Sequence, residues 1–188
     1  MILITGGHGQ LGTELRHLLD EKKIEYVSTD ADELDITDKE GTYKFITDMK
    51  PEIIYHCAAY TAVDKAEDEG KALDEKINVD GTRNVAEAAK AAGSTLIYIS
   101  TDYVFDGTKK EGMYQVDDAT NPLSEYGRTK LLGEKAVQEI MEDYYIIRTS
   151  WVFGIYGQNL IYTIQNLAKK HDRLTIVNEQ IGRQTMTQ

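Results

Sequence analysis

The sequence TGGHGQLG at residues 5–12 follows the apolar run ILI at residues 2–4, and this junction decides the fold. Its glycines Gly6, Gly9 and Gly12 have the spacing G-x-x-G-x-x-G, which lets a strand turn sharply into a helix. Gly6 can adopt backbone angles that other residues avoid, Gly9 lets a pyrophosphate approach the main chain, and Gly12 lets the helix pack against the strand. An ordinary loop is the alternative. The apolar run before the glycines and the leucine-rich amphipathic stretch after them favour a dinucleotide-binding turn.

Length and charge narrow the class of protein. The chain has 188 residues, which suits one domain with a sizeable core, and its formal net charge is −11. A surface this acidic repels nucleic acid and anionic membranes, so any bound phosphate must be held by backbone amides and a few placed cations. The sequence has no apolar run that could span a bilayer and no secretory signal pattern. The single cysteine, Cys57, which we expect to be buried packing rather than a nucleophile, fits a reducing cytoplasm.

We expect no metal site in this sequence. The four histidines lack the spacing of metal ligands. A cluster of acidic residues matches no metal-binding loop, and a solvated helix face explains it better. The cluster comprises Asp64, Glu67, Asp68, Glu69, Asp74 and Glu75.

Apolar runs alternate with amphipathic stretches along the whole chain. This rhythm predicts an α/β fold, a Rossmann-type doubly wound parallel sheet covered by helices on both faces. Strands are expected at Ile2–Thr5, Ile24–Ser28, Glu52–His56, Thr95–Ser100, Tyr144–Arg148 and Leu174–Val177. Helices are expected near Leu11–Asp20, Lys39–Met49, Lys71–Ala92, Glu125–Met141 and Leu160–Lys170. The longest irregular stretch, Asp106–Ser124, follows a strand end, where ligands bind in such sheets, so we expect a functional loop there.

Asp30 follows the second expected strand, about 20 residues after the glycines, where a carboxylate can accept hydrogen bonds from an adenosine ribose. A carboxylate repels a 2′-phosphate, and no lysine or arginine adjoins Asp30 in the sequence. The position therefore favours NADH over NADPH. The alternative is an ordinary turn aspartate, because the surrounding sequence is rich in turn-forming residues.

Tyr126 and Lys130 are four residues apart at the start of an expected helix, so both side chains point the same way. A free tyrosine has a pKa of about 10, and a neighbouring ammonium lowers that pKa by favouring the phenolate. We therefore expect the pair to serve as general acid and base. The alternative is that both residues simply lie on an exposed helix face. Thr101 ends the strand that begins near Thr95, so its hydroxyl reaches the same sheet edge and could donate a hydrogen bond to a substrate carbonyl.

With these elements together, the chain resembles the extended short-chain dehydrogenases/reductases, and within them the dTDP-4-dehydrorhamnose reductase family. The glycine turn and the Tyr/Lys pair are typical of the whole superfamily, whereas Thr61–Glu67, Thr101–Gly107 and Arg148–Gly154 are typical of the reductase branch. The matching stretches are Ile2–Gly12, Cys57–Glu67, Ser100–Gly107, Tyr126–Glu134 and Arg148–Gly154.

The resemblance implies an NAD(P)H-dependent reduction of the C4 keto group of dTDP-4-dehydro-L-rhamnose. It implies catalytic roles for Thr101, Tyr126 and Lys130, with the lysine also bonding the nicotinamide ribose. The residues that the resemblance assigns to the cofactor are Gly6, Gly9, Gln10, Leu11, Gly12, Asp30, Asp35, Ile36, Ala58, Ala59, Tyr60, Thr61, Tyr126 and Lys130. Those assigned to the sugar nucleotide are Thr101, Asp102 and Trp151. Asn78 also matches the family but is equally explained as structural.

The resemblance also implies a division of the chain. Residues 1–177 are expected to form the NAD(P)-binding domain with the catalytic residues, and 178–188 to begin a substrate lobe that is largely absent. The family's Asp-Gln-x-Gly-x-Pro-Thr run is changed here at Glu179–Thr185. The expected partner is a dTDP-sugar, with homodimer formation left open. Two alternatives remain: another nucleotide-sugar 4-reductase or epimerase, and a non-catalytic subunit similar to the regulatory partner of methionine adenosyltransferase.

Overall fold

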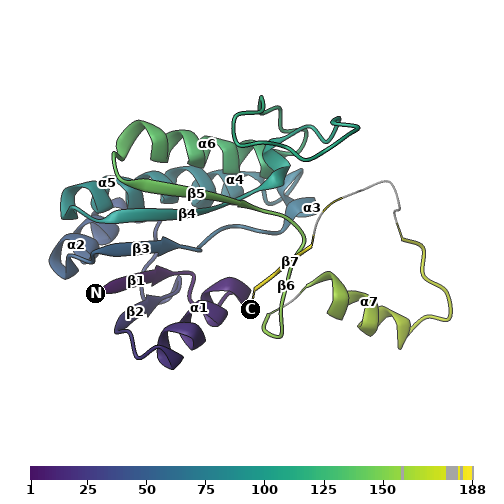
Figure 1. Ribbon diagram of the computed structural model, residues 1–188, viewed down its shortest axis with the longest axis horizontal. Helices are drawn as coiled ribbons and strands as arrows, with labels where there is room; N and C mark the ends of the chain where they lie inside the picture. Colours follow the sequence, from purple (N-terminus) through teal and green to yellow (C-terminus); the bar gives the residue numbers. More distant parts are fainter. Residues whose placement is uncertain (158, 177–181, 183, 188) are drawn as a thin grey trace.

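In the computed structural model, which describes residues 1–157, 159–176, 182 and 184–187, parallel strands form a central sheet in the order β2-β1-β3-β4-β5 (Figure 1). The strands are β1 (Ile2–Thr5), β2 (Tyr26–Thr29), β3 (Ile53–His56), β4 (Thr95–Thr101) and β5 (Tyr144–Thr149). The order reverses between β1 and β3, so the sheet is doubly wound and its ligand crevice is expected at the carboxyl ends of these two strands. Residues 31–38, which follow β2, form turns and irregular backbone.

Helices cover both faces of the sheet, as the sequence predicts (Figure 1). Helices α2 (Lys39–Met49), α5 (Thr82–Ala92) and α6 (Glu125–Ile140) form a layer on one face, and α1 (Gln10–Glu21) lies on the other. Side-chain caps fix where two of these helices begin. Asp38 accepts a hydrogen bond from the amide of Gly41 at 3.2 Å, and Ser124 accepts one from Gly127 at 3.1 Å. The second cap sets the start of the helix that carries Tyr126.

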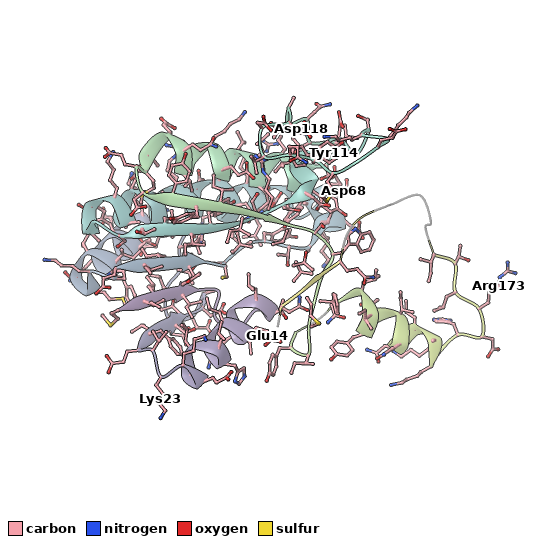
Figure 2. All side chains as sticks on the ribbon, viewed as in Figure 1. Glu14, Lys23, Asp68, Tyr114, Asp118 and Arg173 are labelled. Atoms are coloured by element: carbon pink, nitrogen blue, oxygen red, sulfur yellow. The ribbon has the colours of Figure 1, made fainter. Side chains whose placement is uncertain are left out.

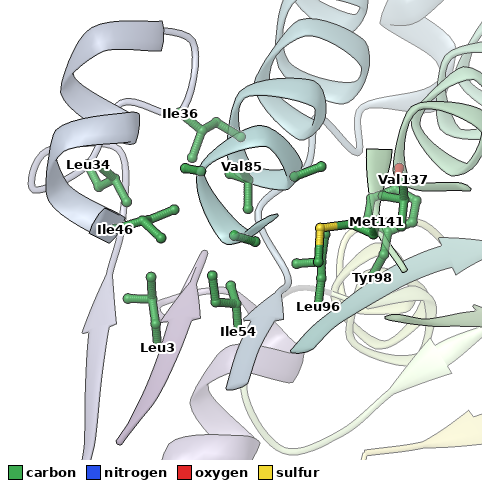
Figure 3. Packing of buried hydrophobic residues seen from close by; sticks show 13 residues of the cluster. Leu3, Leu34, Ile36, Ile46, Ile54, Val85, Leu96, Tyr98, Val137 and Met141 are labelled. Carbon is green, nitrogen blue, oxygen red and sulfur yellow. The ribbon is translucent and has the colours of Figure 1, made fainter. Parts of the chain in front are cut away.

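The core lies between the sheet and the three-helix layer (Figure 3). Leu3, Ile54 and Leu96 project from neighbouring strands and are fully buried, where they meet Ile46 of α2 and Val85 of α5. Each large aliphatic side chain buried in this way stabilises the fold by about 1.5–3 kcal/mol. This rigid layer fixes the carboxyl ends of the strands, where the functional residues lie.

The structure corrects two expected elements. The helix predicted over Lys71–Ala92 is divided into α4 (Lys71–Glu75), a π-helical turn η1 (Lys76–Gly81) and α5. The strand predicted at Leu174–Val177 is wrong over residues 174–176, which are irregular, and Val177 lies outside the described residues.

Several short elements were not expected from the sequence. They are α3 (Val63–Ala66), the 3₁₀ turn η2 (Asp102–Val104), and the parallel pair of β6 (Val152–Phe153) with β7 (Thr185–Met186). Helix α7 (Leu160–Ala168) stands apart from the sheet in Figure 1, and none of its described residues is buried. The altered family run at Glu179–Thr185 falls largely outside the described residues. No helix among the described residues is long and apolar enough to cross a membrane.

The loop expected to be functional, Asp106–Ser124, is held by its own polar contacts. Figure 2 shows Tyr114 and Asp118 on this loop beside α6. The Tyr114 ring stacks on Phe105 at 4.2 Å, and its hydroxyl donates to Asp106 at 3.0 Å. Hydrogen bonds from Thr108, first from its backbone amide, lower the pKa of Asp106 to about 2. The loop therefore has a defined shape next to the end of β4.

Candidate active site

A cavity of about 1020 Å³ opens at the carboxyl ends of β1, β3 and β4. This is the switch-point crevice that a doubly wound sheet predicts. Of the residues proposed from the sequence, all except Tyr60 line it. They are Gly6, Gly9, Gln10, Leu11, Gly12, Asp30, Asp35, Ile36, Ala58, Ala59, Thr61, Thr101, Asp102, Tyr126, Lys130 and Trp151.

The glycine turn forms one end of this cavity. Gly6 has a φ of +69°, a conformation that favours glycine, and a side chain on Gly12 would overlap the carbonyl oxygen of Gly6. Helix α1 begins at Gln10 after an N-cap, Gly9, that makes no side-chain hydrogen bond, and its first turn holds no acidic residue. The first amides of a helix have no acceptor within it, so this end offers donors and a positive dipole to an anion. The site fits a pyrophosphate group.

Acidic residues border the next part of the cavity. Asp30 accepts a hydrogen bond from the backbone amide of His8 at 3.0 Å, which ties it to the glycine turn. The side chain and amide of Thr37 both donate to Asp35 and hold the pKa of that carboxyl below its usual value. Ile36 contributes to the core as well as to the cavity wall. Lys76 also lines the cavity, and its charge acts on Asp35. This cation lies far from the acidic residues in the sequence, so the sequence did not indicate it.

The segment after β3 forms the wall between the two ends. Ala58, Ala59 and Thr61 line the cavity, but Tyr60 does not, which corrects the sequence prediction for this residue. The backbone of Tyr60 is clamped by Asn78, which accepts from its amide at 2.9 Å and donates to its carbonyl at 3.1 Å. The ring then lies outside the cavity, with its hydroxyl against Gly70.

The three expected catalytic side chains meet at the far end of the cavity. Thr101 ends β4 and is buried, and its hydroxyl accepts a hydrogen bond from the amide of Tyr103 at 3.2 Å. The same hydroxyl donates to a carboxylate oxygen of Asp102 at 3.3 Å, and it also acts on the pKa of Tyr126. The Nζ atom of Lys130 donates to the carbonyl oxygen of Ile99 at 2.8 Å and lies 4.1 Å from the centroid of the Tyr98 ring. The sheet edge and the first turns of α6 therefore bring a hydroxyl, a phenol and an amine together.

The expected effect of Lys130 on Tyr126 is wrong. Burial, followed by the charge of Asp74, raises the pKa of Tyr126 to about 12, although the hydrogen bond from Thr101 opposes this rise. Burial lowers the pKa of Lys130 to about 7. The i, i+4 spacing puts both groups on one helix face, but loss of solvent is the largest influence on the pKa of each. Tyr126 is therefore a phenol at neutral pH, ready to give a proton.

Asp102 and Trp151 line the same cavity as Tyr126, and Asp102 lies close enough to act on the charge of Tyr126. Burial raises the pKa of Asp102, and Trp151 is 37% exposed with a φ of +48°. The half-exposed indole is therefore presented by a strained backbone. Tyr103 also lines this end, and its ring meets Tyr126 edge to face at 5.8 Å. Tyr103 follows Thr101 by two residues in the same motif, and this position could have indicated from the sequence that it belongs to the site.

Cys57 lines the cavity and is partly buried, but burial raises the pKa of its thiol to about 12. The thiol is therefore held in its protonated form, which is the less reactive form of a cysteine. Among the described residues, no group of histidine, cysteine and acidic side chains is arranged to hold a metal ion.

Two buried polar groups next to the site were missed. Asp74, expected on a solvated helix face, is fully buried and bonded to Thr129, because α4 packs this side chain against α6. Glu134 is also buried, and Arg148 donates to its two oxygens at 2.9 and 2.7 Å. Thr129 lies 55 residues from Asp74 in the sequence, and Arg148 lies on a strand 14 residues after Glu134, so no helical spacing indicates either contact.

Comparison with known proteins agrees with this geometry. The whole chain, residues 1–188, matches the protein family described as RmlD substrate binding domain. The dTDP-4-dehydrorhamnose reductase of Aggregatibacter actinomycetemcomitans is 44% identical over 182 residues, which cover 96% of this chain and 61% of that protein. The chain spans about three fifths of the length of the curated relatives that it matches.

Two crystal structures of similar proteins have the same fold. A dTDP-4-dehydrorhamnose reductase from Clostridium acetobutylicum matches with a TM-score of 0.94 and 47% identity, over 99% of this chain and 65% of that one. The enzyme of that name from Bacillus anthracis, in complex with NADP, matches with a TM-score of 0.93 and 41% identity, over 99% and 66%. The predicted Rossmann-type fold is confirmed.

Proposed function

The chain belongs to the RmlD substrate binding domain family, and from this premise we propose that it carries the cofactor-binding and catalytic residues of a dTDP-4-dehydrorhamnose reductase. One observation carries the proposal. A single cavity joins the glycine turn at α1 to the hydroxyl, phenol and amine of Thr101, Tyr126 and Lys130. A site that only bound a dinucleotide would not need a partly buried proton donor at its far end.

The proposed reaction reduces the C4 carbonyl of dTDP-4-dehydro-L-rhamnose. A bound nicotinamide supplies the hydride. Tyr126, a phenol at neutral pH, gives its proton to the carbonyl oxygen. Thr101 donates a hydrogen bond to that oxygen and holds Tyr126 in place. Lys130, with a pKa near neutrality, bonds the nicotinamide ribose and stabilises the charge that remains on Tyr126 after the proton leaves.

We propose that NADH binds at least as well as NADPH. Asp30 lies at the cavity rim next to the glycine turn, where its carboxylate can accept from a ribose hydroxyl and repel a 2′-phosphate. His8, 3.7 Å from Asp30, is the group that could weaken this preference when protonated. The NADP bound to the Bacillus anthracis enzyme belongs to that protein, so the preference here is a matter for direct titration.

On the sugar side, we propose that Asp102 and Trp151 contact the deoxysugar, since both line the cavity that also holds Tyr126. Residues 1–177 are proposed as the cofactor domain and 178–188 as the beginning of a substrate lobe. The proposed compartment is the cytoplasm, which suits a chain with one cysteine. Homodimer formation stays a prediction.

The alternatives carry less support. An epimerase and a regulatory subunit share this fold, and fold alone does not choose between them. The relatives with 38–44% identity are named as reductases, which favours the reductase. The partly buried phenol of Tyr126, whose pKa Thr101 influences, favours an enzyme over a binding subunit.

NADH oxidation in the presence of dTDP-4-dehydro-L-rhamnose tests the proposal. The assay is run on this chain and on a longer form of its gene product, with dTDP-glucose as a matched sugar that lacks the keto group. We expect oxidation only with the keto sugar. A folded, NADH-binding protein that oxidises no NADH at either length would refute the proposed function.

A further inference from the structure

A fully buried carboxylate, Asp74, lies beside the helix that carries the catalytic side chains, and none of the roles above uses it. The hydroxyl of Thr129 lies 3.0 Å from each of its carboxylate oxygens, and the amide of Asn78 donates to one of them at 2.6 Å. Thr129 directly precedes Lys130, and its hydroxyl also lies 3.0 Å from the carbonyl oxygen of Tyr126. The carboxylate thus contacts the turn of α6 that contains both catalytic residues.

The charge of this carboxylate is costly to bury. Among the described residues no lysine or arginine forms an ion pair with Asp74. Arg128, which acts on it, is bound to Glu125 and Glu75, and the Nζ atom of Lys130, whose charge also interacts with Asp74, donates to the carbonyl oxygen of Ile99. Burial raises the pKa of Asp74, while the hydrogen bonds from Thr129 and Asn78 oppose that rise. A buried carboxylate without a paired cation destabilises a fold unless hydrogen bonds compensate. Such a group calls for an explanation beyond packing.

The same network reaches the cofactor wall. Asn78 lies within the π-helical turn η1, and π-helical turns are frequent at functional sites. It bonds Asp74 and Thr129 on one side and both backbone groups of Tyr60 on the other. Asp74 therefore sits at the junction of α4, η1, α6 and the segment that lines the cavity after β3.

We propose that Asp74 is a positioning residue of the reductase site, which fixes Tyr126 and Lys130 against the cavity wall by holding Thr129 and Asn78. The kinetic part of this inference rests on the proposed function. A misplacement of reacting groups by about 1 Å can cost a rate on the order of a hundredfold, so a network of this kind can govern turnover without touching the substrate.

The charge of Asp74 gives the inference a second, independent readout. It favours the neutral phenol of Tyr126 and, after burial, is the main cause that raises the pKa of Tyr126 to about 12. The other titratable or charged groups that act on Tyr126 or Asp74 are Tyr98 from β4, Asp102 and Tyr103 from η2, and Glu125, Arg128 and Lys130 from α6.

The first test titrates Tyr126 by NMR of tyrosine labelled with ¹³C at Cζ, assigned with Tyr126→Phe, in wild type, Asp74→Asn and Asp80→Asn. Asp80 is an exposed acid in η1 and serves as the matched control. We expect Asp74→Asn to move the ionisation of Tyr126 to lower pH and Asp80→Asn to leave it in place. An unchanged ionisation in Asp74→Asn would overturn the inference, whether or not the protein is a reductase.

The second test measures kcat on the form of the protein that turns over. Thr129→Val removes the hydrogen bond between α6 and Asp74 and keeps the charge of Asp74. Thr129→Ser keeps the hydroxyl that makes this hydrogen bond. We expect Thr129→Val to lower kcat about tenfold or more and Thr129→Ser to keep kcat close to that of wild type. Of the three variants, only Asp74→Asn should move the alkaline limb of the pH profile of kcat to lower pH. A Thr129→Val variant with the kcat of wild type would refute the positioning role. If Asp74→Asn does not fold, the comparison of Thr129→Val with Thr129→Ser decides whether Asp74 has that role. A wild-type protein without reductase activity would refute the proposed function and leave the titration to decide on Asp74.

Discussion

The Nζ atom of Lys130 lies 2.8 Å from the carbonyl oxygen of Ile99, on the strand that ends at Thr101. This bond draws the lysine into the sheet, where it is 2% exposed. Burial then lowers its pKa from 10.5 to about 7. The amine that serves the proposed reaction therefore destabilises the folded chain, and this cost depends on pH.

Lys130→Met should become more stable than wild type as the pH falls from 10.5 toward 7. The folded pKa of Lys130 is depressed, so the unfolded chain binds more protons in this window and wild-type stability rises with pH across it. The full effect is on the order of 4 kcal/mol, less the lost bond to Ile99. The measurement is the free energy of unfolding at several pH values, with the exposed Lys90→Met as control. A difference between Lys130→Met and wild type that is independent of pH would contradict the depressed pKa.

Arg148→Met should lower the free energy of unfolding by about 3–5 kcal/mol, because it leaves the buried Glu134 without its cation. Ser100, which also donates to Glu134, cannot replace a bidentate arginine. Arg83→Met is the matched control, since Arg83 pairs with an exposed Glu139 and such pairs contribute about 0–1 kcal/mol. Equal losses in the two variants, measured by denaturant unfolding, would show that Glu134 does not depend on Arg148.

Asp30→Ser should weaken NADH binding and raise the affinity for NADPH relative to NADH. The substitution removes the acceptor for a ribose hydroxyl and the charge that repels a 2′-phosphate. Calorimetric titration with both cofactors checks this, with Asp20→Ser, an exposed acid on α1, as control. The assignment of Asp30 fails if the ratio of the two affinities is the same in Asp30→Ser and wild type.

Local pattern was enough to predict the sheet, the glycine turn and the residues at strand ends. Gly6, Asp30, Thr101 and Tyr126 all line one cavity because the carboxyl ends of parallel strands converge there. The periodicity that predicted one long helix over 71–92 could not reveal η1, since an extra residue in one turn hardly changes the apolar spacing.

Burial of polar groups could not be predicted in the same way. In the sequence, Asp74 is one of several acids in an acidic stretch and has no distinguishing feature. In the fold, α6 covers it, and its partner Thr129 lies on that helix. The pKa of Lys130 likewise depends on the removal of solvent by β4 and α6, which no spacing in the sequence states.

Tyr126→Phe tests the central claim most directly, with the exposed Tyr145→Phe as its control. The phenol is the only proposed proton donor, and the ring itself is retained. We expect kcat for NADH-dependent reduction of dTDP-4-dehydro-L-rhamnose to fall by about 10²–10⁴-fold, while NADH affinity stays close to that of wild type. A Tyr126→Phe enzyme that keeps more than about a tenth of the wild-type kcat, a loss well short of that range, would contradict the account.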